Sequence, residues 1–245
     1  MWLLCKDFVN FGHLPCKDTL HNPYSDASIL VRHTIRDLAM SYYEKKILPP
    51  MIRLACGNDA IARQRKLVVP EAQGRVLEVG MGPGLNIPFY NPDKVEKVWG
   101  LEPNTGMRKQ AQSNLEAARF PVEWLDLPGE QIPLEDNSVD TVLLTYTLCT
   151  IPDWRLALEG MRRVLKPGGK LIFCEHGRAP DPGVRKWQNR LNGAWRKMAG
   201  GCNINRPITE YIESSGFVIG KVDTEYIRKT PRIVGYTYRG YAALG

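Results

Sequence analysis

The sequence lacks the patterns that define several large classes of protein. No apolar run approaches the ~18 residues that a membrane-spanning helix requires. The first residues meet charged side chains at once, at Lys6 and Asp7, and do not resemble a secretory signal. No internal repeat or low-complexity tract is present. We therefore expect a globular protein, for which a reducing cytoplasm is the default compartment.

Metal-binding patterns are also missing. The six cysteines, at positions 5, 16, 56, 149, 174 and 202, form no C-x-x-C pair and stand at no metal-ligand spacing from the four histidines. The sequence therefore predicts no bound metal.

Acidic residues are fewer than basic ones, 26 against 33, which gives a net charge of +7. The excess lies in residues 162–206, which hold eleven basic side chains and two acidic ones. Aromatic residues are sparse among these charges, and no pattern for reading a nucleic-acid groove is evident. We therefore expect no nucleic-acid partner.

The length of 245 residues and a hydrophobic content of 43% suit one large domain with a modest extension. Residues 1–39 show no sustained periodicity and form the expected N-terminal extension. Residues 40–70 have a helical pattern and predict a helical cap, in which the pair Pro49 and Pro50 ends one helix and can open a second. The remaining chain completes a domain over 40–245.

After Gly74 the pattern changes to short runs of Val, Ile and Leu separated by helical segments. Strands are predicted at 75–79, 95–101, 122–125, 139–146 and 169–174, and helices at about 85–91, 104–119 and 153–165. The final runs, 217–222 and 233–241, are too close for a helical crossover and predict an antiparallel hairpin. The pattern indicates an α/β fold with an open, doubly wound sheet and a ligand at the carboxyl ends of its first strands.

A glycine-rich loop follows the first predicted strand, with glycines at 80, 82 and 84. Absent side chains let a ligand approach the backbone, whereas the alternative is a tight turn without a ligand. Leu85 replaces the last glycine of the dinucleotide fingerprint, which disfavours a pyrophosphate. Glu102 ends the second strand, where a carboxylate can accept both hydroxyls of a ribose. A nucleotide-like ligand is the better interpretation, and Glu102 alone does not separate NAD from other ribose-bearing cofactors.

Two further segments resemble class I S-adenosylmethionine-dependent methyltransferases: Ile-Pro-Leu-Glu-Asp-Asn-Ser-Val-Asp at 132–140, and Met-Arg-Arg-Val-Leu-Lys-Pro-Gly-Gly-Lys at 161–170. The resemblance implies a Rossmann-like, seven-stranded sheet with an antiparallel last strand, a cofactor-binding half over 71–175 and an acceptor-side segment over 176–245. It also implies S-adenosylmethionine as cofactor. The cofactor-binding residues that it implies are Glu78, Gly80, Gly82, Gly84, Glu102, Pro103, Asn104, Gly129, Glu130, Thr145 and Thr147.

A narrower branch, the alkyl-thiol S-methyltransferases and their bacterial relatives, is similar at 147–149 (Thr-Leu-Cys), 173–176 (Phe-Cys-Glu-His), 187–188 (Trp-Gln) and 201–206 (Gly-Cys-Asn-Ile-Asn-Arg). This resemblance implies a small acceptor, with a thiol favoured. The acceptor pocket that it implies contains Tyr146, Cys149, Trp187, Trp195, Cys202 and Arg206. His176 and Glu175 are the candidate bases; the alternative is a structural role for His176 and a role as an orienting partner for Glu175.

Residues 184–199 form a basic amphipathic helix, with Val184, Trp187, Leu191, Ala194, Trp195 and Met198 on one face. The helix can pack on the core, cover an apolar acceptor or make a weak contact with a membrane surface. The favoured function is S-methylation of a small thiol. The alternatives are N- or C-methylation of an amine lipid or a quinone precursor, and a cofactor-binding protein without catalysis.

Overall fold

A computed structural model describes residues 42–245, so the extension expected over 1–39 lies outside the described residues. The described chain begins with the helical cap: η1 (Tyr43–Ile47), α2 (Leu48–Cys56), α3 (Asp59–Val68) and η2 (Val69–Glu71). Pro49 and Pro50 open a second helix as predicted: they occupy the first turn of α2, where backbone N–H groups need no partner. α2 ends before Gly57, after which the Asn58 side chain accepts two backbone hydrogen bonds and begins α3.

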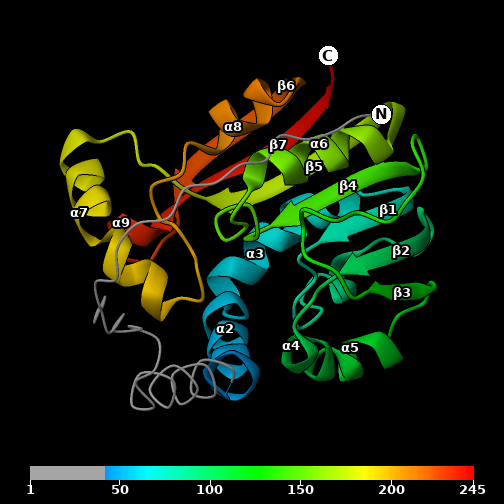
Figure 1. Ribbon diagram of the computed structural model, residues 1–245, viewed down its shortest axis with the longest axis horizontal. Helices are drawn as coiled ribbons and strands as arrows, with labels where there is room; N and C mark the ends of the chain where they lie inside the picture. Colours follow the sequence, from blue (N-terminus) through cyan, green and yellow to red (C-terminus); the bar gives the residue numbers. More distant parts are fainter. Residues whose placement is uncertain (1–41) are drawn as a thin grey trace, which may run out of the picture. The chain divides into compact units, whose positions relative to one another are not determined.

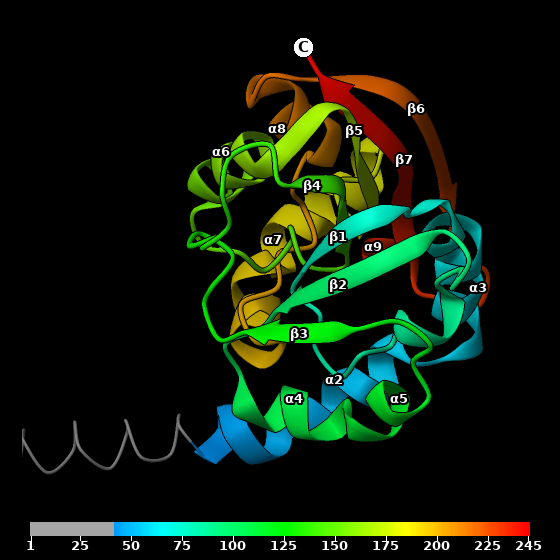
Figure 2. The same ribbon diagram turned by 90° about the vertical axis from the view of Figure 1, so that its right-hand side faces the viewer.

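Seven strands form one sheet in the order β3-β2-β1-β4-β5-β7-β6, which is visible in Figures 1 and 2. Their bounds are β1 (Gly74–Val79), β2 (Val95–Leu101), β3 (Val122–Leu125), β4 (Val139–Thr145), β5 (Leu165–His176), β6 (Phe217–Tyr226) and β7 (Tyr236–Leu244). β1 to β5 pair in parallel, and β7 runs antiparallel to both β5 and β6. The predicted Rossmann-like sheet with an antiparallel last strand is confirmed.

The remaining helices are η3 (Ile87–Phe89), α4 (Thr105–Gln110), α5 (Gln112–Glu116), α6 (Trp154–Val164), α7 (Pro182–Met198), α8 (Ile208–Ser214) and α9 (Arg232–Gly235). The helix predicted at 85–91 is only the short η3, because Pro88 and Pro92 each disfavour helical geometry at the preceding residue. The helix predicted at 104–119 is divided at Ala111, which is fully buried close to Gly84.

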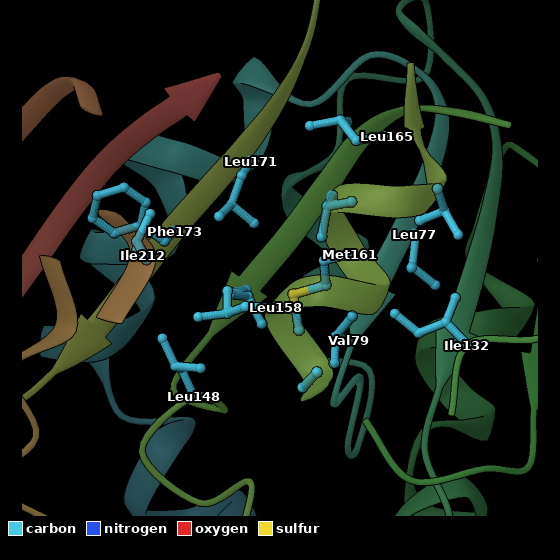
Figure 3. Packing of buried hydrophobic residues seen from close by; sticks show 14 of the residues in the cluster. Leu77, Val79, Ile132, Leu148, Leu158, Met161, Leu165, Leu171, Phe173 and Ile212 are labelled. Atoms are coloured by element: carbon cyan, nitrogen blue, oxygen red, sulfur yellow. The ribbon is translucent and has the colours of Figure 1, made fainter. Parts of the chain in front are cut away.

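The core lies on both faces of the sheet because neighbouring strand residues point to opposite sides. On one face, Leu77 and Val79 of β1 pack with Leu158 and Met161 of α6, as Figure 3 shows. On the other face, Val76 of β1 belongs to a cluster that includes residues at the end of α3 and in η2. Figure 2 shows α6 and α8 on one side of the strands and α3 on the other. Helices on both faces explain why the central strands are continuous apolar runs.

Candidate cofactor and acceptor site

A cleft opens where the chain leaves the carboxyl ends of β1, β2 and β4, and its enclosed volume is about 220 Å³. The strand order reverses between β1 and β4, and open parallel sheets bind ligands at such a point. The lining residues are Leu48, Ile52, Cys56 and Arg65 from the cap; Gly80, Met81, Gly82, Pro83 and Leu85 after β1; Glu102, Asn104 and Met107 after β2; Thr145, Tyr146, Thr147 and Thr150 after β4; and Gly200.

The glycine-rich loop forms the floor of this cleft. Gly80 and Gly82 have φ angles of 71° and 55°, in the left-handed region that favours glycine. A Cβ atom on Gly80 would lie 2.5 Å from Thr147 Oγ1, so the backbones after β1 and β4 approach as closely as glycine permits. Gly84 lies beside Ala111 and is not among the lining residues.

Glu102 lies at the end of β2 with its carboxylate already oriented. Its Oε2 accepts a hydrogen bond from the Gly82 N–H at 3.0 Å, and its Oε1 accepts one from the Asn104 N–H at 2.8 Å. Burial raises the pKa of this carboxyl, against the lowering effect of the two backbone hydrogen bonds. Because a carboxylate has about four lone-pair positions, Glu102 can accept further hydrogen bonds from a ligand in the cleft.

Beneath the loop, Glu78 belongs to a buried polar cluster and does not line the cleft. Its carboxylate accepts hydrogen bonds from Asn86 Nδ2 at 2.8 Å and from the Tyr90 hydroxyl at 2.7 Å. Burial raises the pKa of Glu78 to about 7, and both hydrogen bonds and the nearby Arg65 oppose that rise. Glu78 therefore contacts the residues that support the loop and the cleft wall.

Arg65 of α3 connects this cluster to the cleft, which it lines. Its Nη1 donates hydrogen bonds to Asn86 Oδ1 at 2.6 Å and to Thr145 Oγ1 at 2.9 Å. Its Nε is buried, and no group among residues 42–245 accepts a hydrogen bond from it. The guanidinium group also lies over the Tyr146 ring, 5.5 Å from its centroid. The cleft therefore contains a buried cation with one donor left unpaired by the described protein.

The loop after β4 is held by Glu175 at the end of β5. The side chain of Glu175 is fully buried, and its carboxylate accepts hydrogen bonds from the N–H groups of Thr147, Leu148 and Cys149. In this loop Tyr146 has a φ angle of 57°, an unusual conformation for a bulky residue. Glu175 therefore contacts backbone groups, and it is not among the residues that line the cleft.

His176, the other candidate base, lies behind Tyr146, with the two ring centroids 6.2 Å apart. Its Nε2 is 3.1 Å from Cys202 Sγ, and Cys202 Sγ in turn lies 3.8 Å from Cys149 Sγ. The indole N–H of Trp195 donates to the same Cys202 sulfur at 3.4 Å. The fold thus brings together four of the residues predicted for catalysis and acceptor binding, although none of the four is itself a lining residue.

Other predicted site residues lie outside the cleft. Trp187 is 54% exposed on α7, and Pro103 is exposed at the end of β2. Gly129 lies against Ile151, and the Glu130 carboxylate accepts a hydrogen bond from the Asp153 N–H. Arg206 donates hydrogen bonds to the backbone carbonyls of Leu148 and Ile151.

The apolar face predicted for the helix at 184–199 is largely exposed. Trp187, Leu191 and Met198 are 54%, 38% and 61% exposed. The buried residue of α7 is instead Gln188, whose amide donates to the carbonyls of Gly177, Ile204 and Ile233 and accepts from the Ala179 N–H. α7 is therefore attached to the protein by a buried polar side chain.

Among residues 42–245, no helix combines the length and the apolar character needed to cross a membrane.

Sequence reasoning missed several lining residues, Arg65 and Met81 above all. Arg65 lies in a helical segment that also contains Arg63 and Lys66, so no pattern separates it from surface cations. Its fractional exposure of 5% is a tertiary property. A basic residue on the buried side of an amphipathic helix was the one available signal.

The sheet, the glycine-rich loop and the carboxylate after β2 define a Rossmann-like domain with a cleft for a nucleoside-bearing cofactor. A family model described as a methyltransferase domain matches residues 77–173. Thiol S-methyltransferase TMT1A of Homo sapiens is 31% identical over 185 residues, 69% of this chain and 72% of that protein. Demethylmenaquinone methyltransferase of Clavibacter sepedonicus is 30% identical over 135 residues, 54% of each chain.

Thiol S-methyltransferase TMT1B of Rattus norvegicus is 35% identical over 150 residues, 58% of this chain and 59% of its own length. The chain thus spans about three fifths of that relative. A solved structure of a SAM-dependent methyltransferase from Leishmania major has a TM-score of 0.60 at 16% identity, covers 84% of this chain and 82% of its own, and shares the fold. The chain belongs to the class I S-adenosylmethionine-dependent methyltransferase family.

Proposed function

We propose that this protein transfers the methyl group of S-adenosylmethionine to a small acceptor molecule, and that the acceptor is a thiol. When bound, S-adenosylmethionine supplies an electrophilic methyl group on a sulfonium. The acceptor sulfur forms a bond to the methyl carbon while the bond from that carbon to the sulfonium breaks. The products are a thioether and S-adenosylhomocysteine, and the thiol proton goes to solvent.

The chemistry of the lining residues fits this cofactor. Arg65, a cation that lines the cleft, is a suitable partner for the carboxylate of the cofactor's amino-acid portion. Glu102 has lone pairs that can accept the hydroxyls of a ribose. Leu48, Ile52 and Met107 supply apolar surface for a purine ring. We assign these three roles on the chemistry of the side chains.

One observation carries the choice of a thiol: the described part of the cleft offers little that can remove a proton. Glu102 is the one carboxylate among the described lining residues, no histidine is among them, and the carboxylate of Glu175 is engaged by three backbone N–H groups. A carbon acid or a protonated amine needs a base, whereas a thiol with a pKa near ~8.5 is partly ionised in neutral water. For a thiol acceptor, the residues of the cleft bind and align the two reactants and exclude water.

The relatives named thiol S-methyltransferases support the same choice. The relative named demethylmenaquinone methyltransferase supports the second candidate, C-methylation of a quinone precursor. That reaction removes a proton to generate a carbon nucleophile, so the shortage of bases in the cleft argues against it.

The test measures S-adenosylhomocysteine release by the full chain with a panel of small thiols, amines, phenols and reduced quinone precursors. We expect turnover with thiols, and we expect the rate at a fixed concentration to rise with pH as the thiol ionises. Glu175→Gln should lower the stability of the protein and leave the pH dependence of the rate largely unchanged. Turnover confined to a quinone precursor would favour the second candidate, and cofactor binding with no release for any acceptor would contradict both.

A further inference from the structure

Three soft donor atoms meet behind the wall of the cleft: the sulfurs of Cys149 and Cys202 and the Nε2 of His176. The two sulfurs are 3.8 Å apart, and Cys202 Sγ is 3.1 Å from His176 Nε2. The three donor atoms all lie within 4.8 Å of one another. They come from three separate parts of the fold, the loop after β4, the end of β5 and the turn after α7.

The surrounding protein fixes the position of each donor. Backbone and side-chain N–H groups of Asn203 both donate to the carbonyl of Cys149, which ties the turn after α7 to the loop after β4. The indole N–H of Trp195 donates to Cys202 Sγ at 3.4 Å, and Tyr146 stacks beside His176. Metal ligands are typically oriented by partners of this kind. The cluster is therefore preorganised by contacts that do not depend on a metal.

The distance between the two sulfurs matches that of a tetrahedral metal site, and the distance from Cys202 Sγ to His176 Nε2 is somewhat shorter than in such a site. Two thiolates bound at about 2.3 Å with tetrahedral angles place their sulfurs about 3.8 Å apart. A thiolate and an imidazole at their usual bond lengths lie about 3.6 Å apart. The separation of the sulfurs of Cys149 and Cys202 already has the first value, and His176 needs to withdraw by a few tenths of an ångström to reach the second.

Charge and burial also suit a divalent cation. Cys149 is 1% exposed, and His176 and Cys202 are half-buried. A divalent ion bound by two thiolates and a neutral imidazole forms an assembly with no net charge, because the two thiol protons are released to solvent on binding. A neutral assembly avoids the large cost of placing an unpaired charge in a buried site.

A disulfide is the other chemistry open to two neighbouring cysteines. A disulfide would join the two sulfurs and leave no role for the imidazole, whose Nε2 lies 3.1 Å from Cys202 Sγ. The third donor and the tetrahedral spacing favour a metal.

We propose that Cys149, His176 and Cys202 form a binding site for a divalent cation of the zinc class. Thiolate and imidazole ligands select zinc over magnesium or calcium. Three protein ligands leave a fourth position for an exchangeable ligand. Tyr146 and Thr150, which line the cleft, contact His176 and Cys149. A thiolate of the acceptor is the kind of ligand that suits the fourth position. This role for the acceptor rests on the proposed function, whereas the proposal of a metal site does not rest on it.

The test uses the full chain and the metal ions alone, with no cofactor or acceptor. The protein is first reduced. Reductant and metal are then removed under anaerobic conditions, and the free thiols are counted. Cobalt(II) is then added as a spectroscopic substitute for zinc. We expect a thiolate-to-cobalt charge-transfer band that saturates at one ion per chain and disappears when one equivalent of zinc is added.

Two ligand variants and one matched control locate the site. Cys202→Ser and His176→Gln should weaken cobalt affinity at least about tenfold and diminish or shift the band. Cys56→Ser, which changes a half-buried cysteine beside the same cleft, should leave both affinity and spectrum unchanged. The proposal assigns no ligand to Cys5 or Cys16, so a Cys5→Ser/Cys16→Ser variant should also bind normally.

Trp195→Phe provides a further test if the ligand variants do not fold. It keeps all three ligands and removes only the N–H donor to Cys202 Sγ. We expect the same stoichiometry with an affinity about 10–100-fold weaker. Three results would overturn the proposal: no charge-transfer band in the fully reduced chain, a band that is unchanged in Cys202→Ser, or a reduced chain that binds no metal and forms a Cys149–Cys202 disulfide on oxidation.

Discussion

Replacing Gly80 by alanine should destabilise the protein by about 2–5 kcal/mol. An alanine at the observed φ of 71° costs about 1–2 kcal/mol, because its Cβ crowds the backbone in the left-handed region. The same Cβ would lie 2.5 Å from Thr147 Oγ1 and 2.9 Å from Thr147 Cβ, so Thr147 has to move. Such overpacking costs typically about 1–3 kcal/mol more. Because Thr147 lines the cleft, cofactor affinity should fall with stability.

Two other glycines separate these contributions. Gly168 has a φ of 80°, and a Cβ added there would meet no described atom within 4 Å, so Gly168→Ala isolates the backbone strain. It should cost about 1 kcal/mol, because the loss of unfolded-state freedom offsets part of the strain. Gly183, in α7, has neither a left-handed φ nor a close neighbour among the described residues, and Gly183→Ala should stabilise the protein by up to about 1 kcal/mol.

Urea unfolding followed by circular dichroism measures the three free energies, and calorimetric titration with S-adenosylhomocysteine measures affinity. Adding Thr147→Ala to the Gly80→Ala protein removes the Oγ1 and Cγ2 atoms and should recover part of the lost stability. If Gly80→Ala costs no more than Gly168→Ala, the close approach between the loops after β1 and β4 is refuted. If stability falls and affinity does not, the loop does not form part of the cofactor site.

Three more predictions concern charged side chains in and around the cleft. Because the pKa of Glu78 is raised to about 7, the folded protein holds the carboxyl proton more tightly than the unfolded chain does. The free energy of unfolding that Glu78 contributes should therefore fall by about 3 kcal/mol from pH 4.5 to above pH 7. Urea unfolding of the protein and of Glu78→Gln measures this contribution, and a difference that is constant with pH would contradict the prediction. Arg65→Met should weaken S-adenosylhomocysteine binding about 30-fold or more in calorimetry, whereas Arg63→Met, which removes an exposed cation from the same helix, should not; equal losses would show a general charge effect. Arg206→Met leaves two buried carbonyls without their charged donor, so it should lower the free energy of unfolding by about 2–3 kcal/mol. The KM for the acceptor should change little. A raised KM at unchanged stability would place Arg206 in the acceptor pocket instead.

The strands were predictable because each is a short apolar run flanked by turn residues, and burial on both faces leaves a clear signal. Helix boundaries were less predictable. The pattern predicts one helix over 104–119, whereas the structure divides it at Ala111, a residue buried close to Gly84. The face of α7 was harder still, because periodicity tells which residues share a side and not which side is buried. Gln188 attaches α7 by hydrogen bonds that no hydrophobic pattern records.

The residues of the candidate site were also predictable only in part. The glycine-rich loop and Glu102 are local in sequence, each directly after a strand, and parallel strands bring them to one edge of the sheet. Arg65 lies 15 residues before Gly80, in a helix that precedes β1, and its role depends on which side of α3 the sheet covers. Glu175 was interpreted as a candidate base from its place beside His176, whereas its three hydrogen bonds to the loop after β4 exist only in the folded chain.

The sequence by itself determined the family, the sheet and the glycine-rich loop, because these depend on the local order of apolar, small and acidic residues. It also located the basic excess in residues 162–206. Only the tertiary structure brings two of the cysteines together with a histidine. Cys149, His176 and Cys202 are more than 25 residues apart in sequence and match no ligand spacing, so the sequence predicted no metal. The ends of two strands and one turn bring their donor atoms within 4.8 Å, a proximity created by strand pairing and backbone hydrogen bonds across the fold.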